Sequence, residues 1–229
     1  MTKSPIKNIN KRLTEIKDEF DLFYFIFHPG LQLVNHFSDR ITFHSPESSN
    51  DKGLIIYLSK LDISFSKMQT APADIAVITD RSIKVTGLAT AVTHIWKDNK
   101  VINCLKAYAI NVIPLEAKLM AICIGLMSAL ESTDAHYIIV ITDSLAAANK
   151  IISLDNQHLQ KSIIPIAAKI QMFLEKDGCN SIYFWYCPSK LKWPRHALVD
   201  EEAKTSYNPP SCQKKIHSYS AKRKNAISY

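Results

Sequence analysis

The sequence lacks the long hydrophobic runs that mark a membrane protein. None of its 229 residues belongs to an uninterrupted apolar stretch of about 18 residues, the length that a bilayer-spanning helix needs. The N-terminal segment, Met-Thr-Lys-Ser-Pro, also lacks the apolar centre of a signal peptide. We therefore expect an intracellular protein, nuclear or cytoplasmic, with no membrane partner.

Cysteine pairs of the CxxC type are absent as well. The cysteines are odd in number, five in all, at Cys104, Cys123, Cys179, Cys187 and Cys212. The odd count argues against a disulfide framework, and the spacing argues against a structural zinc held by cysteines. Cys104 and Cys123 have apolar neighbours in the sequence, which is typical of core residues.

Acidic residues are missing from the C-terminal segment, residues 207–229, which carries five lysines and arginines. The whole chain has a net charge of +7, but the other residues hold 23 basic against 21 acidic side chains. The basic character is therefore mainly a property of the tail. Such a tail is typical of a disordered, solvated end, and the alternative is an arm that binds nucleic acid.

Apolar periodicity divides the rest of the chain in two. Residues 1–70 predict an extension of helices and an irregular segment, with an amphipathic helix near residues 6–20. Residues 71–206 predict the main domain, with strands near 75–79, 88–96, 101–109, 137–142 and 182–186 and helices near 115–130, 144–152 and 161–176. Three consecutive strands followed by alternating helices and strands indicate an α/β fold, a mixed five-stranded sheet flanked by helices.

Four acidic residues follow this pattern. Asp80 and Asp143 end two short apolar runs, Glu116 opens the helix after Pro114, and Asp200 follows the last strand. Taken alone, Asp80 and Asp143 are better explained as strand ends that cap the next element, and Glu116 as an ordinary acid of a first helical turn. Together, buried carboxylates on neighbouring elements are costly unless cations join them, and a pair of divalent metal ions is the obvious candidate.

These residues stand in segments that resemble a known family. The segments are residues 78–82 (ITDRS), 115–122 (LEAKLMAI), 141–147 (ITDSLAA), and 185–189 (WYCPS) leading to 200–204 (DEEAK). In this order they are similar to the ribonuclease H domains of non-LTR retroelement reverse transcriptases, particularly fungal ones. The resemblance covers about residues 74–206.

The resemblance implies a ribonuclease H-like fold and hydrolysis of the RNA strand of an RNA–DNA hybrid. It also implies that Asp80, Glu116, Asp143 and Asp200 are the catalytic residues and hold two Mg²⁺ or Mn²⁺ ions. A reverse transcriptase polymerase domain is the implied protein partner.

Two departures from the family leave an alternative open. Arg81 stands where the family usually has Gly, and Lys190 stands where it has a mobile His that helps product to leave. We expect these two residues, with Ser144, Trp193 and His196, to contact nucleic acid or aid product release. The alternative is a decayed domain that binds nucleic acid or a protein partner without cleaving. A transposase-like nuclease fits the order of the acidic residues poorly.

Overall fold

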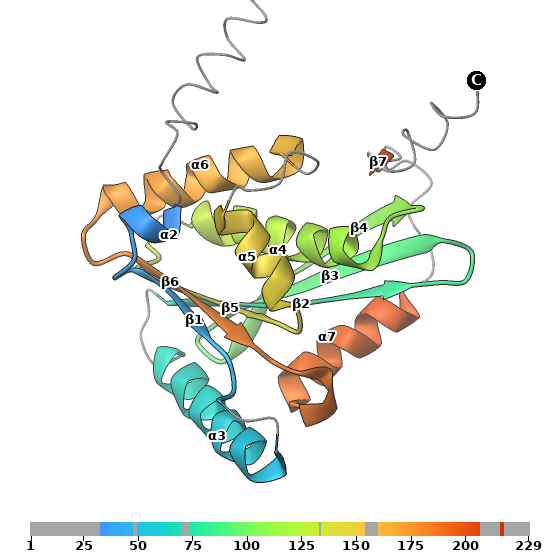
Figure 1. Cartoon of the computed structure of the whole chain (residues 1–229), viewed down its shortest axis with the longest axis horizontal. Helices are drawn as coiled ribbons and strands as arrows, with labels where there is room; N and C mark the ends of the chain where they lie inside the picture. The colour runs from blue at the N-terminus through green and yellow to red at the C-terminus, as the bar shows by residue number, and fades with distance from the viewer. Residues whose placement is uncertain are drawn as a thin grey trace, which may run out of the picture.

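The computed structural model describes residues 33–47, 50–69, 74–132, 134–153, 160–206 and 216–217. Its centre is a seven-stranded sheet with the order β1-β6-β5-β2-β3-β4-β7 (Figure 1). The strands are β1 Ile41–His44, β2 Ile75–Ile83, β3 Leu88–Lys97, β4 Lys100–Ile110, β5 Tyr137–Thr142, β6 Ser181–Tyr186 and β7 Ile216–His217. Strand β3 runs antiparallel to both of its neighbours, and the other neighbouring strands pair in parallel.

Helices cover both faces of this sheet. Helices α4 Pro114–Leu130, α5 Leu145–Ser153 and α6 Gln160–Lys176 lie on one face, beside the short α2 Leu33–His36 (Figure 1). Helices α3 Asp51–Met68 and α7 Pro194–Thr205 lie on the other, and a 3₁₀ turn, η1 Ser189–Leu191, precedes α7. The predicted fold class, a mixed sheet flanked by helices, is confirmed, but the predicted number of five strands is wrong because β1 and β7 were not recognised. None of the helices in these described ranges is long and apolar enough to span a bilayer.

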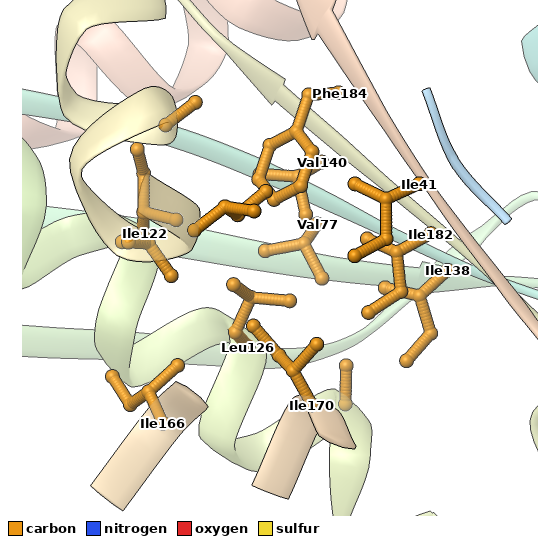
Figure 2. Packing of buried hydrophobic residues seen from close by; sticks show 14 of the residues in the cluster. Ile41, Val77, Ile122, Leu126, Ile138, Val140, Ile166, Ile170, Ile182 and Phe184 are labelled. Carbon is orange, nitrogen blue, oxygen red and sulfur yellow. The ribbon is translucent and has the colours of Figure 1, made fainter. Parts of the chain in front are cut away.

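The core has two halves because side chains alternate between the faces of a strand. On one face, Val77 and Val140 of the central strands pack with Leu126 of α4 and Ile170 of α6 (Figure 2). On the other face, a second cluster joins the sheet to α3 and α7. Strands buried on both faces explain why the sequence shows continuous apolar runs there rather than alternation.

The N-terminal extension is part of this architecture where it is described. Strand β1, in a stretch expected to be irregular, pairs with β6 at the edge of the sheet, and α3 buries Leu61 and Phe65 against the second half of the core. Four residues of strand carry too little periodicity to be recognised. The helix predicted near residues 6–20 lies outside the described residues, as does the predicted basic tail except for the two residues of β7.

One expected core residue is also placed differently. Cys104, expected in the core, is exposed on β4, while Cys123 is half-buried against the core on α4. The apolar neighbours of Cys104 misled the prediction because β4 exposes most of its residues.

Candidate functional site

Asp80 and Asp143 come together at the end of two neighbouring parallel strands. Strands β2 and β5 pair in register up to Thr79 opposite Thr142, so the next residue of each chain segment is one of the two acids. Strand β2 does not end at Thr79, as the sequence suggested, because it continues to pair with β3. One ligand atom from each acid and one from His196 all lie within 4.8 Å of one another.

Glu116, the third predicted ligand, is not a member of this cluster. Its Oε2 accepts a hydrogen bond from the backbone N–H of Ile113 at 3.0 Å, which caps the start of α4 beside Pro114. This bond runs in one direction only, because the aliphatic side chain of Ile113 has no acceptor for an amide of the first helical turn. One carboxylate oxygen of Glu116 is therefore engaged at the start of its own helix.

Helix α4 presents Lys118 to the cluster instead. A helix turns about 100° per residue, so positions 116 and 118 face nearly opposite directions. The Nζ of Lys118 lies 2.6 Å from Oδ2 of Asp143, and the two side chains are 16% and 14% exposed. A lysine ammonium thus occupies the side of Asp143 where a third carboxylate was predicted.

Helix α7 supplies the remaining neighbours. His196 is only 3% exposed, and its Nε2 lies 3.8 Å from Oδ2 of Asp80. The sequence placed His196 in a loop, but Pro194 starts the helix earlier than expected, which buries it. Asp200 follows one turn later and forms an ion pair with Lys204. Asp200 is near enough for its charge to affect Asp80, yet it stands outside the three-residue cluster.

The charges in the cluster oppose one another. Burial raises the pKa of Asp80, and the charge of Asp143 raises it further, while His196 and the backbone N–H of Arg81 lower it. That N–H donates to Oδ1 of Asp80 at 2.7 Å. Two desolvated carboxylates therefore repel each other, and the ammonium of Lys118 offsets the charge of one of them.

These donors fit one small cation better than two. Among the described side chains, Oδ1 of Asp143 and Nε2 of His196 are buried with no hydrogen-bond partner, and with Asp80 they offer three donors to one position. Two ions about 3.5–4 Å apart need more anionic oxygens than this. Glu116 caps its helix and Asp200 is paired with Lys204. The clustered acidic residues offer a place for a divalent cation, and the predicted pair of Mg²⁺ or Mn²⁺ ions stays a prediction.

Trp193 was predicted to touch nucleic acid, and the structure contradicts this. Its side chain is 1% exposed, and its ring centroid lies 5.5 Å from that of Phe65 on α3. Its Nε1–H donates to Oδ1 of Asp62 at 3.0 Å. The indole therefore fills the space between α7, α3 and the sheet.

Three other residues were predicted to contact nucleic acid. Arg81 is half-buried on β2, and its Nε has no hydrogen-bond partner among the described residues. Lys190 is exposed on η1. The hydroxyl of Ser144 accepts the backbone N–H of Ala147 at 3.3 Å and caps α5. The contacts of these residues with nucleic acid stay predictions.

Lys118 is the site residue that the sequence reasoning missed. Its signal was the helical stripe of α4, because Ala121, Ile122 and Gly125, which follow Lys118 at helical spacing, are all buried against the sheet. A lysine at the head of a buried stripe needs an acidic partner, and Glu116 does not lie on that stripe.

Comparisons with known proteins give likenesses of fold. No family model and no curated protein matches the chain. An RNase H1 isolated from compost by a metagenomic approach is 17% identical, with a TM-score of 0.45, over 56% of this chain and 91% of that one. An N-terminal RNase H domain from Mycobacterium tuberculosis, solved as a fusion with maltose-binding protein, is 15% identical, with a TM-score of 0.45, over 59% of this chain and 99% of that one.

Proposed function

We propose that this is a ribonuclease H-type domain that binds RNA–DNA hybrid duplexes at the face of Asp80 and Asp143 without cleaving them efficiently. The proposal takes the hybrid as ligand from the resemblance of residues 78–82, 141–147 and 185–189 to the retroelement family. It is supported by the parallel pairing of β2 and β5, which brings the two aspartates of those segments together.

The observation that supports inefficient cleavage is the ion pair between Lys118 and Asp143. Two-metal hydrolysis needs one carboxylate to bridge the ions and others to complete each coordination shell. Here Oδ2 of Asp143 is bound to an ammonium 2.6 Å away, and Glu116 caps its own helix. The chain itself supplies a positive charge where divalent ions would otherwise be drawn in.

A second candidate function, a metal-dependent hydrolase acting on the same hybrid, is favoured by a different observation. The buried Oδ1 of Asp143 and Nε2 of His196 have no hydrogen-bond partner in the described part of the chain, and with Asp80 they offer ligands for one divalent ion. Under this alternative Asp80, Asp143 and His196 would hold the ion, and cleavage would depend on Mg²⁺ or Mn²⁺.

The deciding experiment uses the full chain with an end-labelled RNA–DNA hybrid, in Mg²⁺, in Mn²⁺ and with a chelator. The proposal expects binding to the hybrid in all three conditions, with a preference over DNA duplex, and no product above that of an Asp143→Asn control. Wild-type cleavage that is lost in Asp80→Asn and Asp143→Asn proteins would establish the hydrolase instead. A chain that binds neither hybrid nor DNA duplex would refute both.

Lys118→Glu provides the matched gain-of-function test. This change removes the competing ammonium and adds a carboxylate at the same helical position, so the protein should acquire stabilisation by millimolar Mn²⁺. Lys118→Gln removes the ammonium without adding a carboxylate and should gain less. Equal responses of the wild type and both variants to Mn²⁺ would mean that Lys118 does not govern metal binding here.

A further inference from the structure

A second group of metal-ligating side chains lies between the β3–β4 hairpin and helix α7. His94 and Cys104 are direct partners in the antiparallel register, and Glu202 of α7 contacts both. Donor atoms from these three residues all lie within 4.8 Å of one another. The group shares no residue with the cluster of Asp80, Asp143 and His196, so it is a separate candidate.

The carboxylate of Glu202 organises this group. Its Oε2 lies 2.5 Å from Nε2 of His94, and its Oε1 accepts from the thiol of Cys104 at 3.3 Å and from Nζ of Lys106 at 2.6 Å. Burial alone would raise the pKa of Glu202, but the hydrogen bonds from Lys106, His94 and Cys104 outweigh it and lower the pKa to about 2. The carboxylate is therefore an anion throughout the physiological pH range.

We propose that His94, Cys104 and Glu202 bind one thiophilic divalent ion of the zinc class. Imidazole nitrogen, thiolate sulfur and carboxylate oxygen are the donors that Zn²⁺ takes in proteins, at about 2.0–2.3 Å. Ligands of a tetrahedral ion at those lengths stand roughly 3.3–3.6 Å apart, so small side-chain rotations complete the site. Hard ions such as Mg²⁺ do not select a thiolate. Three protein ligands leave a fourth position open to water.

Metal binding at this position has two competitors. In the metal-free protein the thiol of Cys104 donates a hydrogen bond to Oε1 of Glu202, so its proton holds the position that the ion would take. The ion takes the thiolate, and that proton leaves to solvent. The ammonium of Lys106, on an exposed residue, turns outward and releases Oε1.

The imidazole has to change tautomer as well. In the metal-free protein its Nε2 faces the carboxylate of Glu202, and Nδ1 is buried with no hydrogen-bond partner among the described residues. When Nε2 coordinates the ion, the ring proton resides on Nδ1. His94 is 8% exposed, which keeps bulk water away from this side of the ion.

Co²⁺ is the probe that tests the site, because a cobalt–thiolate bond gives a charge-transfer absorption in the near ultraviolet. Titration of the reduced full-length chain should give this band with saturation at one equivalent, and Zn²⁺ should abolish it. Cys104→Ser should lose the band. Cys179→Ser, which removes an exposed cysteine outside the group, should keep it. No charge-transfer band at a slight excess of Co²⁺, or an unchanged band in Cys104→Ser, would overturn the proposal.

Two further variants separate the site from folding defects and from the nuclease-like cluster. Lys106→Gln removes the competing ammonium and should tighten Co²⁺ binding by about 2- to 5-fold, a gain that a misfolded protein cannot produce. Asp143→Asn should leave the band unchanged, since Asp143 belongs to the other cluster. Weaker binding in Lys106→Gln, or loss of the band in Asp143→Asn, would count against this assignment.

Discussion

Lys118 and Asp143 form an ion pair of 2.6 Å at the point where strands β2 and β5 bring two carboxylates together. Both side chains are largely buried, at 16% and 14% exposure, so water screens the pair little. The pair joins the first turns of α4 to the loop that follows β5. Asp143 consequently has a counter-ion from its own chain, and under our proposal this contact also competes with metal binding.

Removal of the ion pair between Lys118 and Asp143 should lower the free energy of unfolding. Lys118→Met keeps the aliphatic bulk but leaves the carboxylate of Asp143 buried without its ammonium, and loss of one partner of a buried pair costs about 3–5 kcal/mol. Urea denaturation at neutral pH measures the change. Millimolar Mn²⁺ should restore part of the loss if the vacated position accepts a cation.

The matched control is Lys169→Met. Lys169 forms an ion pair of the same length with Glu131, but the two side chains are 34% and 64% exposed. A surface pair of this kind contributes about 0–1 kcal/mol, so this variant should stay close to the wild type. Equal losses in the two variants would mean that Asp143 does not need Lys118.

The contrast between Lys118 and Glu116 also shows which part of the site could be predicted from the sequence and which part could not. Periodicity located most of the strands and helices of the main domain, and the parallel neighbours β2 and β5 followed from two similar Thr-Asp endings. A continuous apolar run indicates a strand that is buried on both faces, and these two strands are buried in that way. The sequence alone therefore places Asp80 and Asp143 together.

The choice between two neighbouring polar residues of α4 could not be made in the same way. Glu116 satisfies its own helix end, a local interaction, whereas Lys118 meets a residue 25 positions away. A motif reading favours the acidic residue because it matches the chemistry sought. The orientation depends on which helical stripe packs against the sheet, and the buried positions Ala121, Ile122 and Gly125 settle it. His196 and Trp193 were misplaced for a related reason, the early start of α7 at Pro194.

Asp74 should make stability depend on pH. It lies just before β2 and is 7% exposed, and burial raises its pKa to about 6, although the backbone N–H of Tyr137 and the charge of His136 act to lower it. The pKa of Asp74 in the folded protein is above its unfolded value of 3.8. The contribution of the protonated side chain to the free energy of unfolding is therefore complete below about pH 4 and is lost as the pH rises toward 6.

Asp74→Asn tests this sign. The neutral amide does not ionise, so the variant should be more stable than the wild type at pH 8, by on the order of 1 kcal/mol, while the difference should shrink at pH 4. Urea denaturation of both proteins at the two pH values measures it. A variant that is less stable at pH 8 than the wild type would contradict a raised pKa for Asp74.

Trp193 should prove to be a core residue in solution. Trp193→Ala leaves a cavity beside Phe65 and removes the hydrogen bond to Asp62, at a cost of about 3–5 kcal/mol. Lys190→Ala, a few residues earlier on exposed η1, should change stability by less than about 0.5 kcal/mol. Thermal melts compare the two. A small effect of Trp193→Ala on stability with a large effect on hybrid affinity would restore the surface role first predicted for this tryptophan.

Gly125 should tolerate no side chain, because α4 packs there directly on the sheet. A Cβ at Gly125 would lie 2.4 Å from Cγ1 of Val77 and 2.5 Å from Cγ2 of Thr93, both buried and branched side chains that cannot move aside easily. Gly125→Ala should therefore destabilise the protein by about 1–3 kcal/mol, although alanine is the better helix former.

The control is Gly178→Ala, at an exposed turn after α6 where a Cβ meets nothing within 4 Å. This change should be neutral or stabilise by up to about 1 kcal/mol, since alanine restricts the unfolded chain. Urea denaturation of the pair measures the difference. A Gly125→Ala protein as stable as Gly178→Ala would show that α4 stands farther from β2 and β3 than these contacts require, and the reach of Lys118 to Asp143 from the same helix face would then be in question too.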